Sequence, residues 1–168
     1  RHVSNSNFSD QLIKSILAQR SYLCVGLDPQ LRYIPLHIRK EAVRRFGPSL
    51  TACAEAIIAF NRTIIDVTVE SAACFKPQSA FYEPYGFEGI RALECTKEYA
   101  RSTGLPVILD CKREDGGDTS EKYADTYLGT IDMLNEDGGL YETIGPLNFD
   151  AITITPWIDG PNFSPFVD

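Results

Sequence analysis

Histidine is scarce in this chain of 168 residues, which contains only His2 and His37. Because zinc sites are built largely from histidine and paired cysteine ligands, this scarcity argues against a histidine-built zinc site, and we expect no bound metal. The five cysteines are odd in number, widely spaced and without a Cys-x-x-Cys pair. This pattern is typical of free thiols in a reducing compartment, so we expect a cytoplasmic protein.

Long apolar runs and excess positive charge are also missing. No stretch approaches the roughly 20 apolar residues of a membrane-spanning helix, and the first residues lack the layout of a signal peptide. The 16 basic residues stand against 23 acidic residues, which gives a net charge of −7. We therefore expect binding neither to nucleic acid nor to a membrane, and an anionic ligand would need a local cluster of lysine or arginine.

The remaining composition is that of a folded protein. Hydrophobic residues make up 43% of the chain and charged residues 23%, which excludes a wholly disordered chain. A length of 168 residues predicts one core, so we interpret residues 1–168 as part of a single domain.

Four short apolar runs recur along the chain, and each ends at a polar or charged residue. The runs cover residues 22–27, 72–75, 105–109 and 151–154. Helical periodicity is expected over residues 8–20, 50–70, 88–102 and 119–134, whereas residues 28–49 and 135–147 are expected to be loops. Strands that alternate with helices predict an α/β protein with a parallel sheet.

The residues that end these runs are candidates for a shared site. Asp28, Lys76, Asp110 and Thr155 all follow an apolar run, and Lys112 lies two residues beyond Asp110. In parallel sheets and in (β/α)₈ barrels, functional groups lie at the carboxyl ends of the strands. The alternative is that each strand simply ends where charged residues begin, but acidic and basic groups at successive strand ends favour a site.

The pattern Asp-x-Lys-x-x-Asp at Asp110, Lys112 and Asp115 indicates a chemistry. Two residues apart on an extended segment, Asp110 and Lys112 point to the same side, where opposite charges keep each other ionised. A lysine held cationic and dry can protonate a developing carbanion, and an aspartate can face a substrate carboxylate that leaves as CO₂. Taken alone, this pattern is weak, because a surface loop could show it by chance.

Several longer motifs resemble the orotidine 5′-phosphate decarboxylase family, and in particular its branch with longer chains. The motifs are Leu-Asp-Pro at 27–29, Phe-Lys-Pro-Gln at 75–78, Leu-Asp-Cys-Lys-Arg-Glu-Asp at 109–115, Thr-Pro-Trp at 155–157 and Ser-Pro-Phe at 164–166. They occur in the order typical of the family, over about residues 8–166. The resemblance implies a (β/α)₈ TIM barrel, of which this chain supplies about the first four βα units.

The resemblance also implies an activity and the residues that carry it. The reaction is the cofactor-free decarboxylation of orotidine 5′-phosphate to uridine 5′-phosphate, the last step of pyrimidine nucleotide synthesis. Lys112 would donate a proton to C6, and Asp110 would face the departing carboxylate. Lys76 would bridge Asp110 and the ribose, and Asp28 would bind a ribose hydroxyl.

A homodimer with shared active sites is implied in the same way. In the family, the equivalents of Asp115 and Thr119 reach into the site of the partner subunit, and Thr155 would lie beside the pyrimidine. The small-molecule nucleotide is then the ligand, with no metal and no cofactor.

Three features depart from the family pattern. Gly116 follows Asp115 where the family usually has an isoleucine that helps to shape the pyrimidine pocket, and residues 135–147 form a longer connection than usual. Four strands make half of a barrel, and the family's phosphate-binding loops would lie beyond Asp168. We therefore expect an N-terminal portion of a larger gene product, also because the chain begins at Arg1, and the isolated chain is expected to be inactive.

Two other functions stay open. One is a metal-dependent sugar-phosphate decarboxylase of the same wider group, which shares the pattern at 110–115; the other is a non-catalytic half-barrel. Of the remaining aromatic residues, Tyr82 and Tyr85 are expected to be exposed on a loop, and Trp157 is expected to pack against the core.

Overall fold

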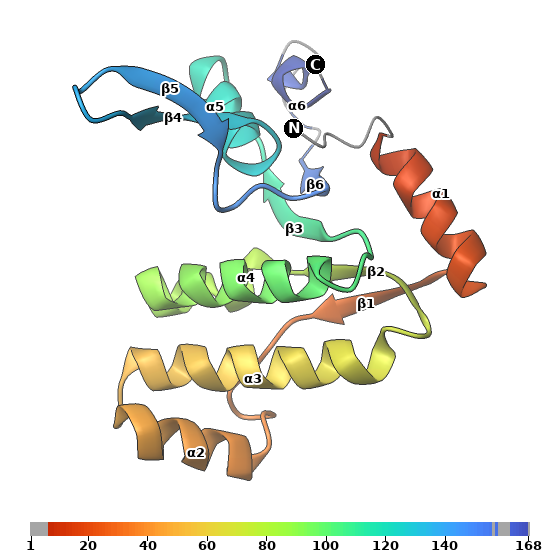
Figure 1. Ribbon diagram of the computed structural model, residues 1–168, viewed down its shortest axis with the longest axis vertical. Helices are drawn as coiled ribbons and strands as arrows, with labels where there is room; N and C mark the ends of the chain where they lie inside the picture. Colours follow the sequence, from red (N-terminus) through yellow and green to blue (C-terminus); the bar gives the residue numbers. More distant parts are fainter. Residues whose placement is uncertain (1–6, 156, 158–161, 168) are drawn as a thin grey trace. The chain divides into compact units, whose positions relative to one another are not determined.

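The computed structural model describes residues 7–155, 157 and 162–167. These residues form two compact units, one up to Ile108 and one from Leu109 onward (Figure 1). Each unit is described by itself. No helix in the described parts of the chain is both long and apolar enough to cross a membrane.

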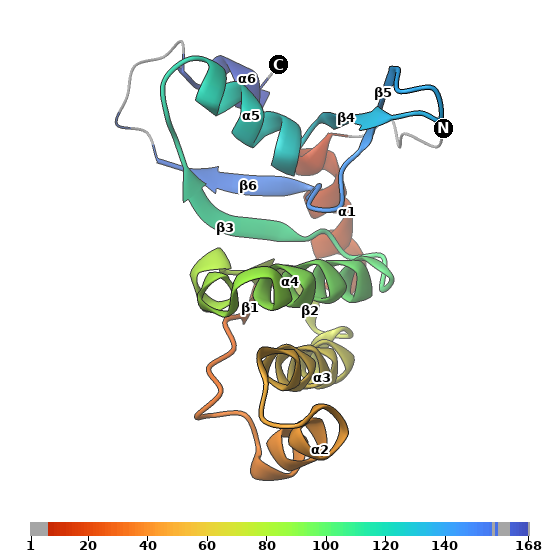
Figure 2. The ribbon, with the colours of Figure 1, turned by 90° about the vertical axis from the view of Figure 1, so that its left-hand side faces the viewer.

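The first unit contains two parallel strands and four α-helices. Its elements are α1 (Phe8–Gln19), β1 (Leu23–Leu27), α2 (Leu36–Phe46), α3 (Leu50–Thr68), β2 (Ala72–Pro77), the 3₁₀ turns η1 (Ser79–Phe81) and η2 (Glu83–Tyr85), and α4 (Gly86–Arg101). Strand β1 pairs with β2 in parallel, and Phe75 of β2 makes a parallel bridge to Val107. Helix α3 packs against both α2 and α4 (Figure 2). Alternation of parallel strands with helices is therefore confirmed for this unit.

Capping residues and apolar faces explain where these helices form. The side chains of Asn7 and Ser49 accept hydrogen bonds from the first turns of α1 and α3, so both helices begin where a polar cap precedes an apolar stripe. Ile57 and Ile65 of α3 and Phe75 of β2 are fully buried, and Leu93 of α4 is almost fully buried. The core of the first unit thus lies between the two long helices and the strand pair.

The second unit combines a strand pair with a hairpin. Its elements are β3 (Ile108–Arg113), which begins at the boundary, α5 (Asp118–Tyr127), β4 (Thr130–Leu134), β5 (Leu140–Ile144), β6 (Ala151–Ile154) and the short α6 (Ser164–Val167). Strands β3 and β6 are neighbours and run in the same direction (Figure 2). Strands β4 and β5 pair antiparallel.

Helix α2 corrects the prediction of a loop over residues 28–49. The helix starts after Pro35 and ends at Gly47, whose φ of 68° suits glycine. Its sequence is rich in charge, and of its residues only Ala42 is buried. The low apolar content of this charge-rich stretch explains why the sequence did not predict a helix here.

The hairpin corrects two further predictions, because the helix expected over 119–134 ends at Tyr127 and the expected loop over 135–147 contains a strand. Leu128 and Gly129 both donate backbone hydrogen bonds to the Ala124 carbonyl, which closes the helix. The turn that follows β4 is closed by a hydrogen bond of 2.9 Å from the Asn135 amide to the Gly139 carbonyl, with Gly138 at a φ of 84°. Adjacent glycines between two short apolar runs are a hairpin signal that the prediction overlooked.

The third strand begins three residues later and ends four residues later than predicted. The expected range was 105–109, but β3 covers Ile108–Arg113, so Asp110 and Lys112 lie inside the strand. Trp157 is also different from expectation, since its side chain is 86% exposed instead of packed.

Candidate active site

The carboxyl ends of β1 and β2 bring Asp28 and Lys76 onto one face of the first unit. Lys76 is the register partner of Gly26, and paired residues of parallel strands point to the same side. A Cβ atom built on Gly26 would lie 3.8 Å from Asp28 Oδ2, so the Asp28 carboxylate lies over the same face. Glycine at position 26 leaves this face open between the two charged side chains.

A buried tyrosine, Tyr82, fixes the backbone at the end of β1 by a hydrogen bond from the protein interior. The hydroxyl of Tyr82 donates a hydrogen bond to the Leu27 carbonyl at 2.8 Å and accepts one from Asn61 Nδ2 at 2.9 Å. Asn61 Nδ2 also donates to Thr96 Oγ1 at 3.0 Å. Burial raises the pKa of the Tyr82 hydroxyl well above its ordinary value. The prediction that Tyr82 is an exposed loop aromatic is therefore wrong: its side chain is completely buried.

Two cysteines lie on the same strand face as Lys76, two residues earlier in the register. Cys24 of β1 is the register partner of Cys74 of β2, so the two side chains are neighbours on one face. Hydrogen bonding from the Cys74 thiol, assisted by the charge of Lys76, lowers the pKa of Cys24 to about 7. The same pairing, with burial, raises the pKa of Cys74.

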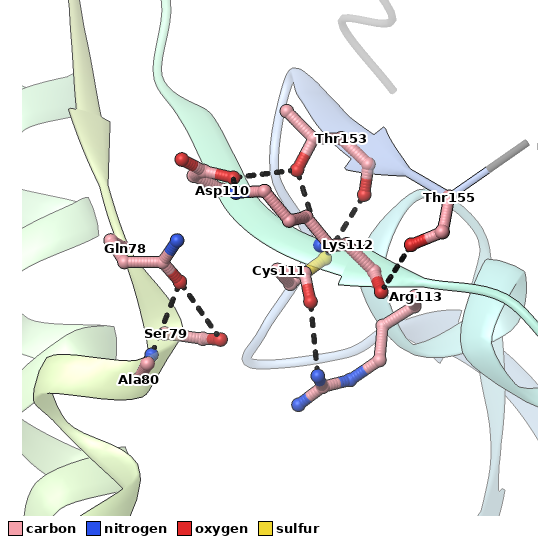
Figure 3. Close-up of polar contacts among 9 residues, drawn as sticks. All are labelled: Gln78, Ser79, Ala80, Asp110, Cys111, Lys112, Arg113, Thr153 and Thr155. Atoms are coloured by element: carbon pink, nitrogen blue, oxygen red, sulfur yellow. Dashed lines mark hydrogen bonds and ion pairs between the residues drawn. The ribbon is translucent and has the colours of Figure 1, made fainter.

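In the second unit, Asp110 and Lys112 form an ion pair on β3 (Figure 3). Lys112 Nζ lies 2.5 Å from Asp110 Oδ1, so the predicted orientation of both side chains to one side is confirmed. The Asp110 side chain is only 13% exposed, whereas that of Lys112 is 60% exposed. The expectation of a dry lysine is therefore not met within this chain.

The backbone at Lys112 is unusual for a strand. Its φ is 48°, in the left-handed region that lysine adopts only at a cost of roughly 1–3 kcal/mol. Such strain persists where the surroundings impose it, and it concentrates at functional sites. The strained backbone is therefore an argument, separate from the charge of the side chain, that Lys112 belongs to a functional site.

Two threonines of the neighbouring segment hold this part of β3 (Figure 3). Thr153 Oγ1 donates to Asp110 Oδ1 at 2.8 Å and accepts from the Lys112 amide at 3.1 Å. Thr155 Oγ1 donates to the Lys112 carbonyl at 3.0 Å. Thr155 was predicted as a site residue from the sequence, whereas Thr153 was missed. Thr153 was overlooked because it lies within an apolar run. Side chains alternate between the two faces of a strand, however, so Thr153 lies on the same side as Thr155.

Asp115 and Thr119 lie on the exposed surface that follows β3. Asp115 Oδ1 accepts a hydrogen bond from the Gly116 amide at 2.7 Å, and Ser120 Oγ bonds both main-chain groups of Asp115. Thr119 lies in the first turn of α5, where its amide donates to the Gly116 carbonyl. Both side chains are exposed, as a role toward another subunit would require.

The structure thus brings the predicted residues together in two groups, Asp28 with Lys76 and Asp110 with Lys112 and Thr155. Among residues 7–155, 157 and 162–167, no cluster of three or more His, Cys, Asp and Glu side chains is arranged to hold a metal ion.

Comparison with known proteins identifies the family. The sequence model of the "Orotidine 5'-phosphate decarboxylase / HUMPS family" matches residues 21–138. This chain belongs to that family. The matched range contains every predicted site residue except Thr155.

Two curated relatives are named orotidine 5′-phosphate decarboxylase. The protein of Caldicellulosiruptor saccharolyticus is 33% identical over 162 residues, which cover 96% of this chain and 51% of the relative. The protein of Rhodopirellula baltica is 35% identical over 161 residues, which cover 96% and 49%. The chain therefore spans about half the length of the curated relatives it matches.

A solved structure supports the same fold. The OMP decarboxylase of Leishmania donovani superimposes with a TM-score of 0.67 at 30% identity, covering 96% of this chain and 49% of that one. The structural neighbours in this family are TIM barrels, so the predicted fold class is confirmed: the chain is α/β and supplies about half of such a barrel.

Proposed function

We propose that the complete protein decarboxylates orotidine 5′-phosphate to uridine 5′-phosphate, and that this chain supplies its N-terminal half. The observation that carries the proposal is the ion pair between Asp110 and Lys112 on β3, at 2.5 Å, in a member of a decarboxylase family. A carboxylate and an ammonium group so close can act on a substrate carboxylate and on the carbon atom that carries it.

The reaction needs one bond to break and one proton to move. The bond between C6 and the carboxylate carbon breaks, CO₂ leaves, and the electron pair stays on C6. Lys112 Nζ then gives a proton to C6. Asp110 lies where its negative charge opposes the substrate carboxylate, so loss of CO₂ relieves that repulsion. The ammonium charge of Lys112 stabilises the developing carbanion before the proton moves, so the proposed reaction uses neither a metal nor a cofactor.

The remaining predicted residues bind the nucleotide in this proposal. Lys76 bridges Asp110 and the ribose, and Asp28 binds a ribose hydroxyl. Their common face at the carboxyl ends of β1 and β2 supports this assignment. Thr155, fixed to the Lys112 carbonyl, lies beside the pyrimidine.

The protein acts as a homodimer with shared sites. Asp115 and Thr119 complete the charged site of the partner subunit, and the exposure of both side chains supports this role. Five free cysteines support a location in the cytoplasm.

Replacement of Lys112 tests the proposal. In the complete gene product, Lys112→Ala should lower the turnover of orotidine 5′-phosphate by more than about 100-fold, since no other group then protonates C6. Lys122→Ala is the matched control, because Lys122 is also an exposed lysine paired with an aspartate, Asp125, at 2.7 Å. Turnover of Lys112→Ala close to that of the control would refute the assignment. Turnover that depends on added Mg²⁺ would favour the sugar-phosphate decarboxylase instead.

A further inference from the structure

Thr153 is the side chain that joins the two members of the Asp110–Lys112 pair. Its hydroxyl makes two hydrogen bonds, one donated to Asp110 Oδ1 at 2.8 Å and one accepted from the Lys112 amide at 3.1 Å. Asp110 Oδ1 is the same oxygen that receives Lys112 Nζ at 2.5 Å. The Thr153 hydroxyl and the Lys112 ammonium group therefore both bond the same carboxylate oxygen of Asp110. Through the Thr153 hydroxyl, β6 is linked to both charged residues of β3 (Figure 3).

The second hydrogen bond explains how the strained backbone is held. In a regular strand, the Lys112 amide would point to a backbone carbonyl of the neighbouring strand. With a φ of 48°, it points to the Thr153 side chain instead. On the other side of the same residue, the Lys112 carbonyl is held by Thr155 Oγ1. Both peptide groups that flank the Lys112 Cα atom are therefore fixed by threonine hydroxyls.

A hydroxyl meets both demands at position 153 with a single oxygen atom. A hydroxyl donates one hydrogen bond while its lone pairs accept another, whereas a carboxylate only accepts and an apolar side chain does neither. Threonine adds a branched Cβ atom with few accessible rotamers, so its hydroxyl stays in place at a small entropic cost. Serine retains the chemistry but has more rotational freedom.

We infer that Thr153 is a positioning residue for the proposed decarboxylation. It orients the Asp110 carboxylate and keeps Lys112 in its left-handed conformation, so that Nζ points at the carbon atom that receives the proton. It does not touch the substrate in this account. The inference rests on the proposed function, because it assigns Thr153 a task within that reaction.

Three variants of the complete gene product test this role. Thr153→Val keeps the shape of the side chain and removes the hydroxyl. It should lower kcat roughly 10- to 100-fold with KM within about twofold, because the reacting groups are misplaced while nucleotide binding remains. Thr153→Ser should restore kcat to within about fivefold of the wild type. Thr126→Val is the control, since it removes a hydroxyl that bonds the Lys122 carbonyl in the same unit, and it should leave kcat unchanged.

The outcomes separate this inference from the proposed function. If the wild type turns over and Thr153→Val keeps its kcat, or if serine restores nothing, the positioning role is refuted. If the wild type does not decarboxylate orotidine 5′-phosphate, the proposed function fails, and crystal structures then test the structural part of the inference, that Thr153 holds Asp110 and Lys112 in place. Loss of the left-handed φ at Lys112 and separation of Nζ from Asp110 in Thr153→Val would support the role; an unchanged pair would overturn it.

Discussion

The hydroxyl of Tyr82 donates a hydrogen bond to the main-chain carbonyl of Leu27, the last residue of β1, at 2.8 Å. Asp28 is the next residue, so the position of a proposed ribose-binding carboxylate is set by a tyrosine 54 residues later in the sequence. Because the same hydroxyl accepts a hydrogen bond from Asn61, the strand end is tied to α3 as well. Buried hydrogen bonds in the interior of the first unit thereby fix the backbone next to Asp28.

This relationship predicts a stability cost for Tyr82→Phe. The change leaves the Leu27 carbonyl and one Asn61 donor without their partner in a buried place, which costs about 1–3 kcal/mol. The free energy of unfolding in urea, measured on the complete protein, tests this value. Tyr99→Phe is the matched control, because its hydroxyl bonds Asp66 at 2.7 Å in an exposed place, so its loss should change the free energy of unfolding much less. Equal effects of the two variants would contradict the account.

A second prediction concerns the close approach of α4 to the turn that carries Tyr82. A Cβ atom on Gly89 would lie 1.9 Å from the Tyr82 carbonyl oxygen, so Gly89→Ala forces backbone to move. We expect a loss of about 1–3 kcal/mol or more in the free energy of unfolding. Gly116→Ala meets no atom within 4 Å and should change stability little. A Gly89→Ala variant as stable as Gly116→Ala would show that the turn moves at little cost.

Most of the fold could be predicted from sequence because its signals are local. Helices α1, α3 and α4 carry broad apolar stripes, and β6 is a short apolar run that ends at Thr155. Helix α2 escaped prediction because it buries little, and the hairpin of β4 and β5 because its strands lie largely exposed.

The charged residues of the site could be predicted from the sequence, whereas the uncharged residues that hold them in position could not. Asp110 and Lys112 stand out because charged residues interrupt an apolar run. Tyr82 and Thr153 are ordinary residues for a loop and a strand, and their roles depend on partners 55 and 43 residues away. Such contacts follow from tertiary structure, which no local pattern encodes.

The thiol pair on β1 and β2 predicts a pH dependence. Since the pKa of Cys24 is lowered to about 7, its thiol should lose its proton around neutral pH, below the ordinary range of a thiol. The Cβ resonance of Cys24 in a ¹³C-labelled protein should therefore titrate with a midpoint near this value. Cys74→Ala removes the main cause and should raise the midpoint more than Lys76→Met, which removes only a charge. A midpoint that stays in place in Cys74→Ala would refute the pairing.

Shared sites predict complementation between two inactive variants of the complete protein. A heterodimer of Lys112→Ala and Asp115→Ala subunits contains one site with both defects and one site with none. Random exchange should then restore about a quarter of the wild-type activity. As a control, Lys112→Ala mixed with Asp110→Ala should restore nothing, because both residues belong to the same subunit's part of each site. Activity in neither mixture, with exchange verified by mass spectrometry, would place Asp115 in its own subunit's site or outside the site.

The last prediction concerns a polypeptide of these 168 residues made on its own. A (β/α)₈ barrel removes its sheet edges by closure, which four βα units cannot achieve. In β1, the side chain of Leu23 is 48% exposed, and only Leu27 is buried, although this run was predicted to be covered on both faces. Several hundred Å² of apolar surface left open would cost on the order of 10 kcal/mol, as much as the whole stability of a typical domain.

We therefore expect this polypeptide to be inactive, and to be either loosely packed or self-associated through its open edges. Size-exclusion chromatography and near-ultraviolet circular dichroism at micromolar concentration distinguish these states, with the complete gene product as the control. The control should show a sharp aromatic spectrum and turn over orotidine 5′-phosphate. A monodisperse, rigidly packed monomer of 168 residues that catalyses the reaction would show that half a barrel suffices, because the open strand edges would then cost far less than the exposed apolar area implies.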